Sequence, residues 1–173
     1  MSVKEIENDV TGLSTATNRK EAEYNLLESL LSAAGFQDSE ESILEVEMKR
    51  RGKYLFTVRI HPLSDKDVAF ARKKATVYMP NPNNKKLPPI EKDFNHAKFN
   101  GWIVYLATVE EDQEQIWGNK ELMQKLGVME SWEVVGKVLT AGEKNWLADK
   151  VYEISGMDES DDEFTDEEEY AKN

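Results

Sequence analysis

The fold depends most on residues 95–109, whose sequence is NHAKFNGWIVYLATV. Apolar residues in this stretch recur at the spacing of one face of an α-helix, at Phe99, Trp102, Ile103 and Leu106. From Trp102 to Ala107 the sequence is apolar almost all round, which is typical of a helix that neighbours cover on every side. We therefore expect residues 95–109 to form the most buried helix of the protein.

Other helices are expected on both sides of this segment. Their apolar residues recur with the helical period, and two of them begin with a capping box, Ser64 with Asp67 and Thr140 with Glu143. The Ser or Thr side chain in such a box accepts a hydrogen bond from an amide that the helix leaves unpaired. The predicted helices are 19–34, 65–78, 119–127, a short segment from Ser131, and 141–155.

Two stretches, 43–48 and 54–60, alternate their side chains with the period of a β-strand. Gly52 between them tolerates the backbone geometry of a tight turn, so we expect an antiparallel hairpin near 43–60. Because a lone hairpin is only marginally stable in water, its apolar face must rest on helices. The predicted fold class is α+β, a mainly helical single domain with one antiparallel β-hairpin.

The remaining residues are expected to form a loop and the two ends. Residues 79–89 hold four of the five prolines and are predicted to be an exposed loop. Residues 1–17 are polar without an apolar period, so we predict a flexible N-terminal arm. Nine of the twelve residues from 158 to 169 are acidic, which predicts an acidic disordered tail over 158–173. These limits leave 18–157 as the mainly helical domain.

Composition excludes several kinds of site. The chain has 173 residues, a formal net charge of −12 and no cysteine, which excludes disulfides, zinc–thiolate sites and iron–sulfur clusters. Its two histidines, His61 and His96, are too few for a metal centre built from histidine. No apolar run approaches the roughly 18 residues that a membrane span needs, and the first residues lack the apolar core of a signal peptide. We expect a cytoplasmic location and no membrane partner.

The sequence also lacks a recognisable catalytic set. Its nine glycines form no phosphate-binding motif. Nucleophilic catalysis needs an activating base, but His61 precedes a proline at a strand end and His96 lies in a first helical turn. The carboxylates occur in solvated runs rather than as a pair in contrasting environments. We therefore expect no enzyme activity, no cofactor and no metal site.

The tryptophans are the candidate residues for binding a partner. Trp102 lies in the predicted buried helix and is assigned to the core. Trp117 and Trp132 lie at helix junctions, and Trp146 lies off the apolar stripe of its helix. Half-exposed tryptophans often anchor protein contacts, so these three are predicted to bind a partner, with burial in the core as the alternative for each.

The middle of the chain is basic although the whole is acidic. Residues 49–98 contain thirteen basic and four acidic residues, a net charge of +9. This leaves two interpretations open, local binding of nucleic acid or pairing with the acidic ends of the same chain. The pattern of an RNA-binding strand is not met, because Lys53 stands where an aromatic residue is required. Nucleic acid is therefore not the expected partner.

Seven short segments, in this order, resemble one known family. They are 58–67 (VRIHPLSDKD), 72–76 (RKKAT), 97–99 (AKF), 105–112 (YLATVEED), 116–120 (IWGNK), 139–144 (LTAGEK) and 153–156 (EISG). Together they look like the XkdN-like tail assembly chaperones of tailed phages and prophages. The resemblance runs from about residue 23 to residue 156, and its specificity comes from the ordered series rather than from any one segment.

The resemblance implies a non-enzymatic role. Proteins of this family act in the host cytoplasm, where they bind the tape measure protein and keep it soluble until the tail tube polymerises around it. They are not expected in the mature virion. Further implied partners are a frameshifted longer form of the chain itself and the tail tube protein. Two other functions stay open, a structural tail component of the virion and a small nucleic-acid-binding regulator.

Overall fold

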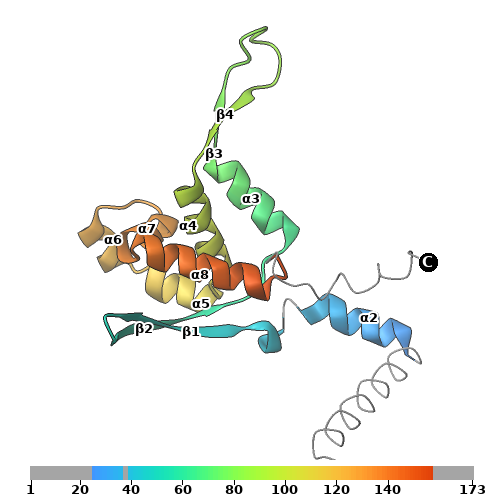
Figure 1. Ribbon diagram of the computed structural model, residues 1–173, viewed down its shortest axis with the longest axis vertical. Helices are drawn as coiled ribbons and strands as arrows, with labels where there is room; N and C mark the ends of the chain where they lie inside the picture. The colour runs from blue at the N-terminus through green and yellow to red at the C-terminus, as the bar shows by residue number, and fades with distance from the viewer. Residues whose placement is uncertain (1–24, 37–38, 158–173) are drawn as a thin grey trace, which may run out of the picture. The chain divides into compact units, whose positions relative to one another are not determined.

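The computed structural model describes residues 25–36 and 39–157, which fall into two units, 1–39 and 40–173. The first unit contributes the helix α2 (Leu26–Gly35). The second begins with a short 3₁₀ helix, η2 (Glu40–Ser42). Its further elements, drawn in Figure 1, are β1 (Leu44–Arg50), β2 (Lys53–Ile60), α3 (Asp65–Ala75), β3 (Thr76–Met79), β4 (Ile90–Phe94), α4 (His96–Ala107), α5 (Glu110–Asp112), the π-helix η3 (Gln113–Trp117), α6 (Lys120–Leu126), α7 (Ser131–Val138) and α8 (Ala141–Ile154).

The predicted class, a mainly helical α+β protein, is confirmed for the described residues, but the predicted single hairpin is wrong. Within residues 25–36 and 39–157 there are two antiparallel sheets of two strands, β1–β2 and β3–β4. In Figure 1 they lie at opposite ends of the helices of the second unit, and β3–β4 extends away from those helices. We call β3, β4 and the loop between them the arm, residues 76–94.

The β1–β2 hairpin follows the predicted alternation. Val46 and Met48 of β1 and Val58 and Ile60 of β2 are buried, while the glutamates between the β1 residues are exposed. The turn is the pair Arg51–Gly52, both with positive φ (52° and 77°). Such a two-residue turn matches the right-handed twist of the strands, and glycine adopts its second position without strain.

The prediction of one helix over 65–78 is wrong at its end, because the arm begins at residue 76. That helix ends at Ala75, where the Thr76 hydroxyl donates to the carbonyl of Arg72 (2.8 Å), and residues 76–79 form a strand. Thr76, Val77 and Tyr78 are residue types that fit a pleated surface better than a helix. Their partner strand lies beyond the proline-rich loop, so the local period of residues 65–78 gave no sign of the pairing.

The predicted central helix is confirmed as α4. Ile103, Val104 and Ala107 are fully buried, and α4 packs against α3, α7 and α8. Two backbone hydrogen bonds join strand β2 to the C-terminal end of α4, from His61 N to Ala107 O (2.8 Å) and from Val109 N to Arg59 O (3.0 Å). The main core therefore lies between the β1–β2 sheet and the helices of the second unit.

Most other predicted helices agree with the structure within a few residues. The segments 119–127, from Ser131, and 141–155 correspond to α6, α7 and α8. Both predicted capping boxes are present, at Ser64 with Asp67 and at Thr140 with Glu143. The predicted helix 19–34 is α2 from residue 26 onward, and its first residues lie outside the described ones. Residues 1–17, predicted to be flexible, and residues 158–173, predicted to be an acidic tail, also lie outside the described residues.

The chain between α4 and α6 was not predicted to be regular, yet it forms α5 and η3. Gly118 closes the π-helix, because its amide donates to the carbonyl of Gln113 (2.6 Å), a bond spanning five residues. A Cβ at this position would lie 3.1 Å from the same carbonyl oxygen, a tight contact that favours glycine. The wider turn directs the side chain of Trp117 into the core, where it is fully buried.

Within the described residues, none of the helices combines the length and the apolar character needed to span a membrane.

Candidate partner-binding surface

The structure separates the three candidate tryptophans. Trp117 is completely buried, and its indole nitrogen donates to the hydroxyl of Thr108 (2.9 Å). Its ring meets the edge of Phe56, with centroids 5.9 Å apart. A side chain in this position cannot reach a partner without opening the core. The prediction that Trp117 lies half exposed is therefore corrected in favour of the core alternative.

Trp132 is half buried on α7. Its ring stacks on Trp102 of α4, with centroids 5.1 Å apart and an angle of 18° between planes. Lys98 also lies over the Trp132 ring, with its Nζ 5.4 Å from the ring centroid. The indole nitrogen donates to the carboxylate of Glu130. Trp132 therefore keeps a solvent-facing part, framed by charged groups.

Trp146 is 45% exposed on α8, and it borders a recess of about 430 Å³. The recess lies between β1 and α8 and is lined by Glu47, Met48, Lys49, Gly142, Glu143 and Trp146. Trp146 is the exposed apolar side chain of this lining, because Met48 is only 2% exposed and Gly142 has no side chain. Of the three predicted residues, Trp146 has the surroundings that best suit a partner contact, an exposed aromatic ring beside an apolar hollow.

An ion pair fixes the shape of this recess. Arg50, at the end of β1, donates to both oxygens of Glu143 in α8, at 2.8 and 2.7 Å, and to the carbonyl of Val138 at 3.1 Å. Glu143 also accepts from the amide of Thr140 (2.8 Å), so one carboxylate both caps α8 and holds the hairpin to it. A bidentate pair of this kind constrains orientation as well as distance.

The same contacts make the Glu143 region sensitive to pH. The hydrogen bond from Arg50, followed by that from the Thr140 amide, lowers the pKa of Glu143 from 4.5 to about 2. Because the pKa in the folded state is below the unfolded value, the ionised carboxylate contributes stability that is fully present above about pH 4.5. That contribution is lost as the pH falls from about 4.5 toward 2.

We predict that acidification destabilises the wild-type protein more than Glu143→Gln. The glutamine can still cap α8 through its side-chain oxygen, but it has no charge to lose. Urea unfolding at about pH 6 and about pH 3 measures the loss of free energy for each protein, and the other carboxylates contribute to both. Equal losses in the two proteins would contradict the assigned role of the ion pair.

The helix α2 presents a second apolar surface, which the sequence reasoning did not single out for binding. Its exposed apolar residues, 48–70% accessible, are Leu26, Leu27, Leu30, Leu31 and Phe36. The leucine repeat was visible in the sequence and predicted the helix. Periodicity identifies the apolar face of a helix but not whether anything covers that face, so the exposure could not be foreseen.

The two histidines make contacts with neighbouring residues in the chain. His61 Nδ1 lies 2.8 Å from the carbonyl of Pro62, and His96 meets the edge of Phe94. In the part of the chain that the structure describes, no three His, Asp or Glu side chains are grouped so that they could hold a metal ion. A second recess, of about 570 Å³, is lined mainly by polar residues: Tyr105, Glu110, Gln113, Glu114, Gly118, Lys120 and Ser131.

Comparisons with known proteins identify the family. The model of the phage XkdN-like tail assembly chaperone proteins matches residues 25–172, which is most of the chain. The chain therefore belongs to this family, and the resemblance drawn from its ordered segments is confirmed. Comparison with curated proteins gives no match. Among solved structures, the chain is similar to the crystal structure of the protein yqbn, a structural genomics target, with 19% identity and a TM-score of 0.40, covering 68% of this chain and 88% of that one.

Proposed function

We propose that this protein binds the tape measure protein of its phage in the host cytoplasm and keeps it soluble until the tail tube polymerises around it. The observation that carries the proposal is membership of the tail assembly chaperone family over residues 25–172. On this proposal the protein makes and breaks no covalent bond and is absent from the finished virion. A frameshifted longer form of the chain and the tail tube protein are the further proposed partners.

The physical requirement is a surface that covers apolar helix reversibly. A long chain that awaits its tube exposes apolar stripes, and these aggregate if they stay uncovered. The recess beside Trp146 and the leucine face of α2 are exposed apolar surfaces of the kind that could cover such stripes. Release is easiest if each contact is moderate, about 8 kcal/mol or micromolar, and if many copies share the length of the partner.

We predict that Trp146→Ala weakens binding to the tape measure protein by about 30-fold, because a buried tryptophan anchor typically contributes about 2 kcal/mol. Titration of a soluble tape measure fragment, followed by calorimetry, gives the affinity. Tyr78→Ala is a matched control, since Tyr78 is a similarly exposed aromatic residue (48%) on the arm, in β3. Equal affinities for Trp146→Ala and wild type would remove the recess from the proposal, and no binding by the folded wild type would overturn the function itself.

The main alternative is a structural component of the tail. The two roles differ in the purified particle, where a subunit is stoichiometric and a chaperone is missing. Quantitative mass spectrometry of mature tails therefore separates them.

A further inference from the structure

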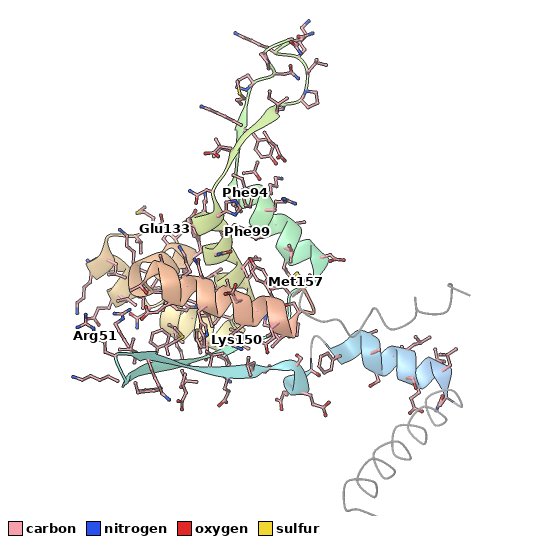
Figure 2. All side chains as sticks on the ribbon, viewed as in Figure 1. Arg51, Phe94, Phe99, Glu133, Lys150 and Met157 are labelled. Atoms are coloured by element: carbon pink, nitrogen blue, oxygen red, sulfur yellow. The ribbon has the colours of Figure 1, made fainter. Side chains whose placement is uncertain are left out.

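Positive charge is concentrated around the arm. Residues 72–98 contain seven basic and two acidic residues, although the whole chain carries a net charge of −12. They include the last turn of α3, the arm, and the first turn of α4. Arg72, Lys73 and Lys74 are all exposed, and Arg72 lies over the ring of Phe94 at the base of the arm, 5.7 Å from its centroid. Figure 2 shows Phe94 and Phe99 close together at this base.

Beside the arm, aromatic rings and two lysines form one continuous surface. We call it the basic aromatic surface, and it consists of Phe70, Lys74, Lys98, Trp102 and Trp132. The edge of Phe70 meets Trp102 at 5.4 Å, and Trp102 stacks on Trp132. Lys74 Nζ lies 5.4 Å from the Phe70 centroid and 5.5 Å from that of Trp102. At these distances the negative faces of the rings attract the ammonium groups.

This surface has an unused hydrogen-bond donor. Trp102 is only 8% exposed, and its buried indole nitrogen has no acceptor among the described residues. A buried donor without a partner costs about 1–3 kcal/mol, so an oxygen that reached this nitrogen would gain a hydrogen bond. Phe70, whose ring lies against Trp102, is 43% exposed. Cations, aromatic faces and a free N–H together suit an acidic peptide that also carries aromatic side chains.

The chain contains a peptide of this chemistry. Residues 158–173 hold nine acidic residues and one lysine, with Phe164 and Tyr170 among the acidic groups. The surrounding charge is opposite, since residues 72–98 sum to +5 and residues 158–173 to −8.

The segment also starts close enough to reach the surface. Ser155 accepts a hydrogen bond from the amide of Leu63 (3.0 Å), two residues before α3, and Figure 2 places Met157 near the start of that helix. Phe70 and Lys74 lie about 8 Å and about 14 Å along α3, at 1.5 Å per residue. Sixteen extended residues span about 50 Å, so the peptide reaches the surface with slack.

We propose that the basic aromatic surface is a docking surface for acidic peptide and that residues 158–173 of the same chain occupy it. A tethered segment has an effective concentration in the millimolar range, which favours it over the same segment of a second copy. The contact is largely electrostatic and therefore weakens as salt shortens the Debye length. This goes beyond the proposed function, because it concerns the chain alone and needs no phage protein.

The absence of cysteine allows a clean test. A nitroxide label on Ser160→Cys in the full chain broadens the NMR signals of nearby amides. In ¹⁵N-labelled protein at low salt we expect signal loss at residues 70–74 and 98–102. We expect the signals to recover in about 1 M NaCl, where the Debye length is about 3 Å. They should also recover in the double variant Lys74→Glu/Lys98→Glu.

The matched control is Lys53→Glu/Lys120→Glu, which changes the net charge equally at exposed positions in β2 and α6, two elements that contribute no residue to the surface. Signal loss should persist in this control. Loss at no amide, or equal loss around Lys53 and Lys120, would overturn the proposal. A mixing experiment tests for a second copy: chains with the nitroxide but no ¹⁵N are added to ¹⁵N chains without the nitroxide. If the signal loss in this mixture equals that in the doubly labelled chain, the peptide comes from a second copy and the proposal is overturned. The salt titration of the wild type gives the answer even if the double variant fails to fold.

Discussion

Replacing Trp117 by alanine is expected to lower the free energy of unfolding by about 3–5 kcal/mol, the largest effect of any single change considered. The side chain is fully buried between β2 and the helices, where it contacts Phe56 and donates to Thr108. The substitution removes a large apolar volume, leaves a cavity, and takes away the donor that the Thr108 hydroxyl uses. Several elements of the core lose contacts at once.

Urea unfolding followed by far-ultraviolet circular dichroism measures the change without depending on tryptophan fluorescence. Trp146→Ala is the control, because it removes the same side chain from an exposed position and should cost about 0.5 kcal/mol or less. The loss of free energy for Trp117→Phe should fall between those for Trp117→Ala and Trp146→Ala, since phenylalanine keeps a ring but has no N–H. A small loss for Trp117→Ala, equal to that for Trp146→Ala, would return Trp117 to the candidate partner contacts.

The second large effect is expected for Asp112→Ala, a loss of about 2–3 kcal/mol. Asp112 follows α4 and holds the end of β2. Its carboxylate accepts from the Arg59 amide (2.8 Å) and from the Arg59 guanidinium (2.7 Å to Nη2), and its side chain is only 11% exposed. Burial, the largest single influence, raises the pKa of Asp112, but the hydrogen bonds from the Arg59 side chain and amide outweigh it and lower that pKa. Alanine leaves both donors without this acceptor.

Glu111→Ala provides the matched control for this prediction. Glu111 pairs with the same guanidinium at 2.8 Å, but its side chain is 74% exposed. Water solvates an exposed pair well, so its loss should cost less than about 1 kcal/mol. The difference between the two variants in urea unfolding isolates the buried part of the interaction. Similar losses for the two would mean that Asp112 contributes no more than a surface ion pair.

These two positions also bear on function. The Arg59–Asp112 contact and the burial of Trp117 hold the β1–β2 sheet to the helical core, and β1 forms one wall of the recess beside Trp146. Variants at the core positions should therefore disturb partner binding indirectly, through stability. Trp146→Ala should disturb it without that loss, which is why stability and affinity need to be measured on the same variants.

The elements that the sequence predicted well are those encoded by residues near one another in the chain. The central helix followed from the apolar run at 102–107, and the starts of α3 and α8 followed from capping boxes whose members lie three residues apart. The β1–β2 hairpin followed from alternation on both sides of Gly52. Each of these features depends on backbone geometry over a few residues, which the local pattern is sufficient to specify.

The candidate site was foreseen only as a choice among three tryptophans. Local spacing placed Trp117 and Trp132 at helix junctions and Trp146 off the apolar stripe of its helix, but it could not say which of them other elements would cover. The π-helix turned Trp117 inward, Trp102 took up one face of Trp132, and Trp146 stayed exposed. The leucine face of α2 was missed as a surface for the same reason.

By itself, the sequence determined the helical character, the caps, the first hairpin and the family. These features depend on the periodicity of neighbouring residues and on the order of short segments. The tertiary structure alone decided the arm, the recess and the long-range ion pairs of Arg50 and Arg59. Arg59 meets Asp112 across 53 residues and Arg50 meets Glu143 across 93, so these contacts exist only once distant elements have packed together. Exposure is a property of that packing, and a partner-binding surface is defined by exposure.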